Sequence, residues 1–133
     1  MKKYTHREEH RKHLVKSRGE VFTPEALVEE VLNALPAAVW EDPSKKWLDP
    51  ACGSGNFLIC VYRRLMVSLT TTIPVEEDRR KHILENMIFG IDIRALNCIW
   101  TMKRLDPENK YRLNVVNADS LKYDCKFART CCE

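Results

Sequence analysis

The string Asp49-Pro-Ala-Cys-Gly-Ser-Gly-Asn-Phe57 has the residue types and spacing of a loop that could bind a ligand. It joins a short apolar stretch to an amphipathic one. Gly53 and Gly55 would let backbone N–H groups approach the ligand closely, and a helix that begins after them would point its positive end at the same place. A Gly-x-Gly pair alone is usually an ordinary turn. With Asp49 at the end of a strand, the whole string predicts a loop for a nucleotide-type cofactor.

Two more carboxylates accompany apolar runs of strand length. Asp92 lies in the run 88–93, and Asp119 follows the run 111–118. A carboxylate at the end of the second strand can accept hydrogen bonds from both hydroxyls of a ribose, which is the role predicted for Asp92. It follows Gly53 at about twice the roughly twenty residues of a dinucleotide unit, and the loop lacks a third glycine, which argues against NAD. Each acid could also be a plain turn residue.

The elements that must position these residues alternate between strand and helix. Thr23 is expected to cap the first helix, with Pro24 in its first position. Apolar residues at helical spacing mark the helix after the glycine loop, and the charged residues of 75–87 suit a solvated helix face. The expected order is a helix from 24 to about 36, a strand at 46–50, helices at 57–69 and 75–87, a strand at 88–93, a helix with the apolar stripe Ala95, Cys98, Ile99, Met102 and Leu105, and a strand at 111–118.

This alternation predicts an α/β fold with a parallel sheet and right-handed crossovers. The expected architecture is Rossmann-like and truncated to about three parallel strands, with flanking helices and an N-terminal helical arm. In such a sheet the ligand crevice lies at the carboxyl ends of the strands. Every candidate residue falls at such an end, so we expect these residues to meet there.

Four blocks of the chain, in the same order, resemble the motifs of N6-adenine DNA methyltransferases, especially those of type I and type IIG restriction-modification systems. The resemblance implies the fold of S-adenosylmethionine (SAM)-dependent methyltransferases. It covers most of the chain and is carried by Phe22-Thr23-Pro24, by the loop from Asp49 to Phe57, by Gly90-Ile-Asp92-Ile93 and by Asn117-Ala-Asp119-Ser120-Leu121.

The resemblance also implies a role for each block. Thr23 would help to hold the methionine end of SAM, although helix capping explains this residue equally well. Asp49 would lie near the SAM amino group, Asp92 would bind the ribose, and Asp119 would contact the adenine amino group. Phe57 would close over the cofactor, with Leu121 against the adenine ring. The expected cofactor-binding set is Phe22, Thr23, Asp49, Ala51, Gly53, Gly55, Asn56, Phe57, Asp92, Ile93, Asp119, Ser120 and Leu121.

One motif of this family is missing. These enzymes carry an Asn/Asp-Pro-Pro-Tyr/Phe tetrapeptide shortly after the third strand, and this sequence has no Pro-Pro pair. An exocyclic adenine amine is a poor nucleophile until hydrogen-bond acceptors of this kind engage it, and an aromatic ring stacks on the flipped base. We therefore assign no catalytic residue. Two hypotheses stay open: an adenine-N6 DNA methyltransferase whose catalytic half lies on a second polypeptide or beyond a frameshift, or a non-catalytic module that binds SAM or a partner.

Composition divides the chain into three parts. Residues 1–18 form a basic arm with seven Lys/Arg and two Glu, residues 19–124 form the incomplete cofactor-binding domain, and residues 125–133 form an irregular tail with three cysteines. The arm could neutralise DNA phosphates or be a solvated helix. The uncompleted sheet predicts a second polypeptide or self-association at its open edge. With 133 residues, 44% of them hydrophobic, the chain has room for one small domain.

The six cysteines do not suggest a disulfide framework. Cys52, Cys60 and Cys98 fall in predicted loop and helix positions, where reduced core thiols are expected. The tail cysteines lack the paired spacing of a zinc site, so no metal is expected. The sequence also has neither a run of about eighteen apolar residues nor an apolar signal segment, so we expect a cytoplasmic protein without membrane contact.

Overall fold

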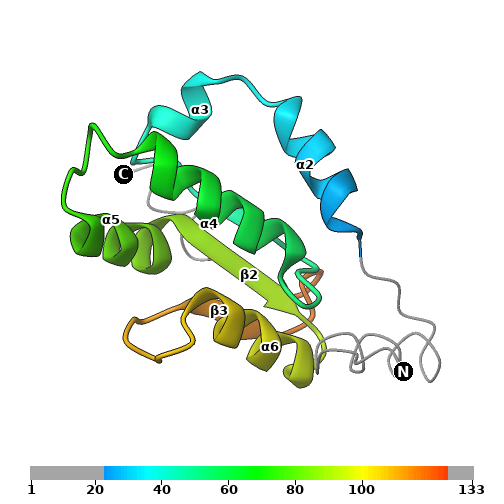
Figure 1. Ribbon diagram of the computed structural model, residues 1–133. Helices are drawn as coiled ribbons and strands as arrows, with labels where there is room; N and C mark the ends of the chain where they lie inside the picture. Colours follow the sequence, from blue (N-terminus) through cyan, green and yellow to red (C-terminus); the bar gives the residue numbers. More distant parts are fainter. Residues whose placement is uncertain (1–22, 126–133) are drawn as a thin grey trace, which may run out of the picture.

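The computed structural model describes residues 23–125, which form a three-stranded sheet and its covering helices (Figure 1). The alternation of strands and helices predicted from the sequence is confirmed. The elements are α2 (Glu25–Asn33), α3 (Ala38–Glu41), β1 (Trp47–Asp49), α4 (Asn56–Ser68), α5 (Glu76–His82), the π-helical turn η1 (Ile83–Met87), β2 (Ile88–Asp92), α6 (Ala95–Leu105) and β3 (Asn114–Asn117).

The three strands are parallel and lie in the order β1-β2-β3. Asp49 of β1 pairs with Gly90 of β2, and Asp92 pairs with Asn117 of β3. The strands therefore end at one edge of the sheet, as the predicted truncated α/β fold requires. This edge collects the ends of all three strands and the loops that follow them.

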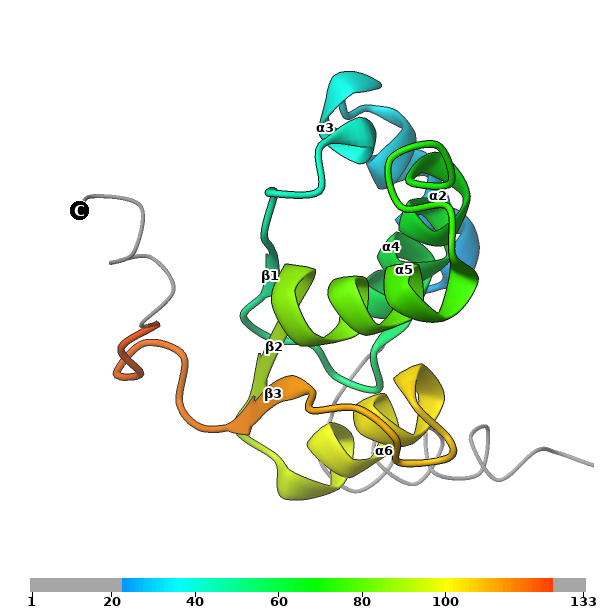
Figure 2. The same ribbon diagram turned by 90° about the vertical axis from the view of Figure 1, so that its left-hand side faces the viewer.

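The hydrophobic core lies between the sheet and one layer of helices. Helices α4, α5 and α6 all lie on the same side of the strands (Figure 2). The apolar stripe predicted after the glycine loop was Phe57, Val61, Leu65 and Leu69. Its last three members are buried and Phe57 is partly buried. Each such side chain contributes about 1.5–3 kcal/mol through burial. The fully buried apolar side chains are Val28, Leu58, Cys60, Leu65, Leu69, Ile83, Leu84, Met87 and Ile88.

The start of α2 differs from the prediction. Pro24, rather than Thr23, occupies the N-cap position with an extended backbone, and no side chain among the described residues caps the helix. The capping role predicted for Thr23 is therefore wrong. Proline fits this position because its fixed φ and missing N–H cost nothing before the first helical turn.

Two helical segments depart from the sequence-based expectations. The short helix α3 was not predicted; it brings Trp40 against Trp47, with ring centroids 4.4 Å apart. Helix α5 is not a purely solvated face, because Arg79 is only 8% exposed. Its guanidinium donates to the carbonyl oxygens of Ile73 and Pro74, 2.9 and 3.3 Å away. The turn that precedes the helix thus satisfies one nitrogen of this buried guanidinium, Nη1.

Helix α6 turns a partly polar face inward. The buried residues are Asn97, Cys98, Thr101 and Leu105, whereas Ile99 of the predicted apolar stripe is exposed. The expected stripe is therefore wrong for part of its length. The side-chain amide of Asn97 donates to Asp92 at the end of β2, and the Thr101 hydroxyl donates to the Gly53 oxygen in the glycine loop.

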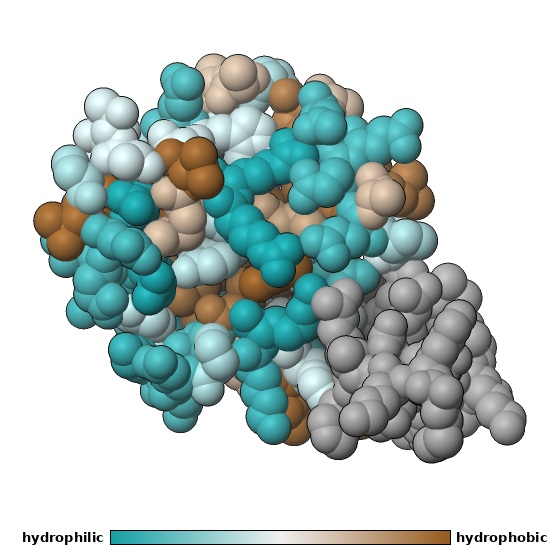
Figure 3. Space-filling view, viewed as in Figure 1, coloured by the Kyte–Doolittle hydropathy of each residue, from teal (hydrophilic) through white to brown (hydrophobic). Residues whose placement is uncertain are grey.

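The two faces of the sheet are covered to different extents. The side with the helix layer is mostly hydrophilic outside, with separate hydrophobic patches (Figure 3). On the opposite side a hollow of about 260 Å³ includes Leu48, Phe89 and Tyr123 in its lining. Leu48 remains 39% exposed there. Among residues 23–125, no helix combines the length and apolarity needed to cross a membrane.

Substitution of Gly90 in β2 can test how tightly α4 packs on the sheet. A Cβ at this position would lie 2.8 Å from the Cδ1 of Leu58. We expect Gly90→Ala to cost about 1–3 kcal/mol through overpacking. Leu58→Ala should cost about 2–5 kcal/mol through its cavity. Leu58→Ala removes the atom with which the new Cβ would clash. In urea unfolding, the double variant should therefore lose less free energy of unfolding than the two single variants together. Strictly additive losses would contradict this packing.

Candidate functional site

The loop between β1 and α4 depends on its two glycines. Gly53 and Gly55 have φ angles of 55° and 89°. The loop is tied to the sheet by the Cys52 N–H, which donates to the carbonyl oxygen of Ile91 at 2.9 Å. A Cβ on Gly55 would lie 3.0 Å from the side chain of Thr101. The positive φ and this close approach both select glycine at position 55.

Asp92 connects the loop to β2 and α6. Its Oδ2 accepts the Gly53 N–H at 2.9 Å. Its Oδ1 accepts the Arg94 N–H at 2.8 Å and the side-chain amide of Asn97 at 3.1 Å. An ionised carboxylate has about four acceptor positions, and these bonds use three. The remaining position is on Oδ2. Binding of both ribose hydroxyls by Asp92 stays a prediction.

Asp49 ends β1 close to Asp92. Its Oδ1 accepts the Ala51 N–H at 3.1 Å, which shapes the first turn of the loop. Burial raises the pKa of Asp49, and the negative charge of Asp92 raises it further, although the Ala51 hydrogen bond opposes both effects. Two neighbouring carboxylates at a half-buried position favour a cation between or beside them. This site is therefore electrostatically suited to a positively charged ligand.

The segment that precedes α2 reaches the same loop. The Asn56 side-chain amide donates to the backbone oxygen of Thr23 at 2.6 Å. Thr23 thus meets the loop through its main chain, while Phe22 lies outside the described residues. Phe57 lines a hollow of about 290 Å³ with Trp47, Leu48 and other apolar side chains.

The segment after β3 joins this edge through Asp92. Its backbone oxygen accepts the Ala118 N–H at 3.0 Å and the Asn117 side-chain amide at 3.1 Å. Asp119 follows and uses its Oδ1 to accept the Leu121 N–H at 3.0 Å. The block Asn117–Leu121 is therefore anchored to the block that contains Asp92. The side chains of Ile93 and Leu121 are 69% and 94% exposed, Ala51 is exposed, and Ser120 is partly buried.

Sequence analysis missed three residues that support the loop from α6. Thr101 Oγ1 donates to the Gly53 oxygen at 3.0 Å, and Arg104 donates to the Ser54 oxygen at 2.8 Å. Asn97 holds Asp92, as described above. The available signal was the spacing of polar residues at 97, 101 and 104, which places them along one side of a helix. The apolar residues between them favoured a different inward face.

The thiol of Cys52 lies under the loop and is not suited to nucleophilic chemistry. Burial raises its pKa to about 12, against a partly opposing hydrogen bond with Thr101. Burial also raises the pKa of Cys60, to about 11. Both groups are thus protonated near neutral pH, whereas reactive cysteines need the thiolate. Cys52, Cys60 and Cys98 are free, as predicted.

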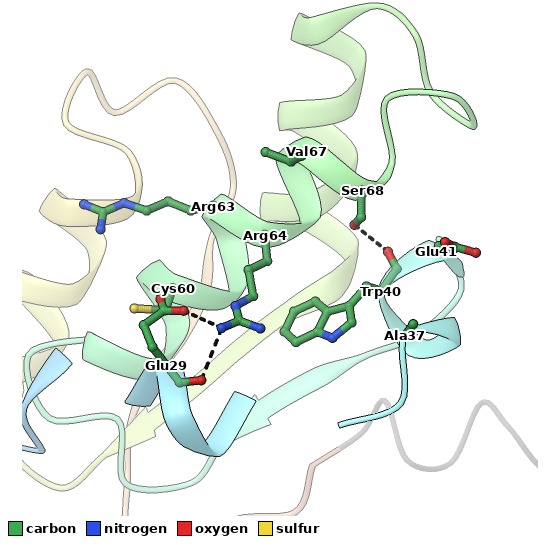
Figure 4. A pocket seen from close by; sticks show the side chains of 9 residues that line it. All are labelled: Glu29, Ala37, Trp40, Glu41, Cys60, Arg63, Arg64, Val67 and Ser68. Carbon is green, nitrogen blue, oxygen red and sulfur yellow. Dashed lines mark hydrogen bonds and ion pairs between the residues drawn. The ribbon is translucent and has the colours of Figure 1, made fainter. Parts of the chain in front are cut away.

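A separate cavity of about 490 Å³ lies among α2, α3 and α4 (Figure 4). Arg64 crosses it and bonds to Glu29 and to the Oδ1 of Asn33, the latter at 2.8 Å. The guanidinium carbon also lies 5.2 Å from the ring centroid of Trp40. These contacts join the three helices to one another. No residue of the loop 49–57 lines this cavity, and we assign it a structural role.

No cluster of three or more metal-ligating side chains occurs among residues 23–125. Cys125 is described as a free, partly buried thiol. Cys131 and Cys132, for which no zinc site was expected, lie outside the described residues, as does the basic arm. The candidate site therefore consists of the loop, the three strand ends and the inner side of α6.

The fold is that of an α/β domain with a parallel sheet, and its glycine loop joins β1 to α4. The profile of the family described as N-6 DNA Methylase matches residues 6–127. The chain therefore belongs to this family. Because the match spans nearly the whole sequence, it includes all four blocks that carried the resemblance.

Curated relatives agree with this membership. The chain is 35% identical over 89 residues to an uncharacterized adenine-specific methylase of Mycoplasma pneumoniae, an alignment covering 65% of this chain and 21% of the relative. It is 44% identical over 112 residues to the adenine-specific methyltransferase BrxX of Escherichia coli, covering 77% and 9%. The chain thus spans about a fifth of the length of the first relative and about a tenth of the second.

A solved structure supports the fold. The modification subunit of a putative type I restriction enzyme from Vibrio vulnificus superposes with a TM-score of 0.61 at 22% identity. The alignment covers 88% of this chain and 23% of that subunit. The three-stranded arrangement is therefore shared with one part of a much longer protein.

The charge of Asp49 should reduce stability at neutral pH. Its raised pKa means that the folded chain keeps the proton at pH values where the unfolded chain, with an ordinary value of 3.8, has released it. Stability is therefore lost as pH rises through this window. Asp49→Asn keeps an acceptor for Ala51 without the charge. We expect urea unfolding to show the variant more stable than the unaltered chain at about pH 7 and similar at about pH 3.

The matched control for this prediction is Asp42→Asn on a surface loop. Hydrogen bonds from Ser44 lower the pKa of Asp42. The negative charge of Asp42 therefore stabilises the folded chain at neutral pH, whereas that of Asp49 destabilises it. This control should gain no stability at neutral pH. Equal behaviour of the two variants, or a loss of stability in Asp49→Asn, would contradict the electrostatic account of the site.

Proposed function

We propose that this chain binds SAM and forms the cofactor-binding part of a DNA methyltransferase that acts on the N6 amine of adenine. The observation that carries the proposal is the contact between Gly53 and Asp92, which joins a glycine loop to the carboxylate at the end of the next strand. Family membership supports methyl transfer as the reaction class. SAM as the cofactor and adenine in DNA as the substrate are the further parts of this proposal.

The donor and acceptor groups of the loop fit the methionine end of SAM. Helix α4 begins at Asn56 after Gly55, and no side chain of the described residues caps its N-terminus. A helix N-terminus favours an anionic group such as the SAM carboxylate. Asp49 supplies the opposite charge for the SAM ammonium. We assign Ala51, Gly53, Gly55 and Asn56 to this part of the cofactor.

The adenosine end would lie toward β2 and β3. The remaining acceptor position on Asp92 suits a ribose hydroxyl, with Ile93 beside it. We assign Asp119, Ser120 and Leu121 to the adenine ring and its amino group. The large exposed surface of Leu121 supports this assignment, because a bound ring would remove it from water. Phe57, with Phe22 and Thr23, completes the proposed set.

Charge favours SAM over common phosphate-bearing nucleotides. Burial raises the pKa of Asp49 most, and repulsion from the negative charge of Asp92 raises it further. SAM brings an ammonium and a sulfonium, which would offset this repulsion, whereas NAD and ATP would bring more negative charge. The methyl group on the sulfonium is the chemistry that the cofactor supplies. The described residues bind and orient the cofactor.

Transfer to adenine needs acceptors for the target amine and a ring to stack on the flipped base. The sequence has no Asn/Asp-Pro-Pro-Tyr/Phe tetrapeptide for these tasks. We therefore propose that they are performed by polypeptide outside residues 1–133. The basic arm, with its seven Lys/Arg, is proposed to contact DNA phosphates in a salt-dependent manner.

Asp92→Ala should weaken SAM binding by about 1–3 kcal/mol, because it leaves a ribose hydroxyl and the Gly53 N–H without their acceptor. Isothermal titration of the purified 133-residue chain measures this, with ATP and NAD as competing ligands. Asp78→Ala, an exposed acid on α5, is the matched control and should bind normally. Absence of SAM binding by the folded, unaltered chain would overturn the proposed function, and unchanged affinity in Asp92→Ala would overturn the ribose assignment.

The sheet face opposite the helices is the proposed contact for a second polypeptide or a second copy. Leu48 and Phe89 contribute apolar surface there, and β1 is an edge strand. Uncovered edges and apolar patches favour association. Sedimentation of the unaltered chain should therefore show self-association, which Leu48→Glu should reduce. Val67→Glu, at a 76% exposed site on α4, should have no effect. A monomer at all concentrations would contradict contact with a second copy through this face.

A further inference from the structure

Helix α6 reaches the candidate site through an arginine that the predicted motifs do not include. One nitrogen of Arg104, Nη1, lies 2.8 Å from the backbone oxygen of Ser54 and 2.8 Å from the Oδ1 of Asn56. Ser54 and Asn56 are 6% and 8% exposed. The guanidinium therefore bonds to both sides of Gly55, within the turn that begins α4.

The chemistry of the guanidinium determines the orientation of Asn56. Arginine has only hydrogen-bond donors, so it can engage the amide oxygen of Asn56 but not the amide nitrogen. The nitrogen must then point away from Arg104. It donates to the backbone oxygen of Thr23 at 2.6 Å. If this amide were rotated by half a turn, two donors would face each other at Arg104 and two acceptors at Thr23.

The Asn56–Thr23 hydrogen bond holds a segment that has few hydrogen-bond donors of its own. Pro24 follows Thr23 and has no N–H, and α2 begins without a side-chain cap among the described residues. The Asn56–Thr23 bond joins this junction to the loop. Arg104, Asn56 and Thr23 thus form a chain of contacts from α6, across the start of α4, to the segment before α2.

We propose that Arg104 is a positioning residue that presets the cofactor loop by locking Asn56 between Ser54 and Thr23. This inference rests on the proposed function, because its effect on binding requires that the loop binds SAM. Arg104 does not contact the cofactor in this proposal. It acts by holding the Ser54 carbonyl and the Asn56 amide in one arrangement before the ligand arrives.

The central test is Arg104→Met, which keeps a long side chain and removes the donors. We expect SAM affinity in isothermal titration to fall about tenfold, which corresponds to about 1.4 kcal/mol. Arg104→Lys should recover part of this loss, because an ammonium can still donate to these acceptors. Arg63→Met is the matched control: Arg63 is exposed on α4 and pairs with Glu25 at 2.9 Å. Its SAM affinity should not change.

A double-variant cycle distinguishes positioning through Asn56 from a general loss of packing. Arg104→Met combined with Asn56→Ala should weaken SAM binding by less than the product of the two single effects, because both substitutions break the same chain of contacts. Multiplicative effects would overturn the proposal. Unchanged affinity in folded Arg104→Met would also overturn it. If Arg104→Met does not fold, Arg104→Lys takes its place in the cycle, with the same criteria.

Amide hydrogen exchange on the ligand-free chain separates this inference from the proposed function. Arg104→Met should speed exchange selectively at the start of α4 and in the first turn of α2, while the core of β2 keeps its protection. Selective loss of exchange protection at these two places would support the positioning role, whether or not the unaltered chain binds SAM. Failure of the unaltered chain to bind SAM would overturn only the proposed function. Unchanged or uniformly faster exchange would overturn the positioning role.

Discussion

The carboxylate of Asp92 is the interaction on which the rest of the site depends. It ends β2, accepts the N–H of Gly53 in the glycine loop, and is held by Asn97 from α6. Its backbone oxygen also receives the segment after β3. A single buried residue thus sets the positions of three segments that are distant in the sequence. Because a charged acceptor forms stronger hydrogen bonds than a neutral one, this group is well suited to fix the loop.

The same carboxylate makes the site costly to fold. Asp49 lies close enough for its pKa to be raised by the charge of Asp92 and, more strongly, by burial. A ligand with positive charge would relieve a repulsion that the folded chain carries without it. Strain of this kind is characteristic of functional sites, where stability is given up for binding. The negative charges at the loop thus match the positive charges of the proposed cofactor.

The helices cover one face of the sheet, and this asymmetry bears on function. Leu48 and Phe89 on the other face retain apolar surface, although the core on the helix side is well filled. The chain corresponds to less than a quarter of the Vibrio vulnificus subunit that it resembles in fold, at 23% of its length. The described residues can supply a cofactor loop, but the groups that would engage adenine are not among the motifs of this sequence.

The sequence by itself determined the strand-helix order, the glycine loop and the placement of Asp49 and Asp92 at strand ends, because these depend on local periodicity and turn chemistry. It also pointed to the family through four short blocks. Only the tertiary structure decided that Pro24 occupies the N-cap position of α2, that α6 buries Asn97 and Thr101, and that Arg104 donates to the Ser54 oxygen. These features depend on partners about fifty residues away in the case of Arg104. A polar residue becomes a good interior residue only when folding brings it a hydrogen-bond partner, and no local pattern encodes that partner.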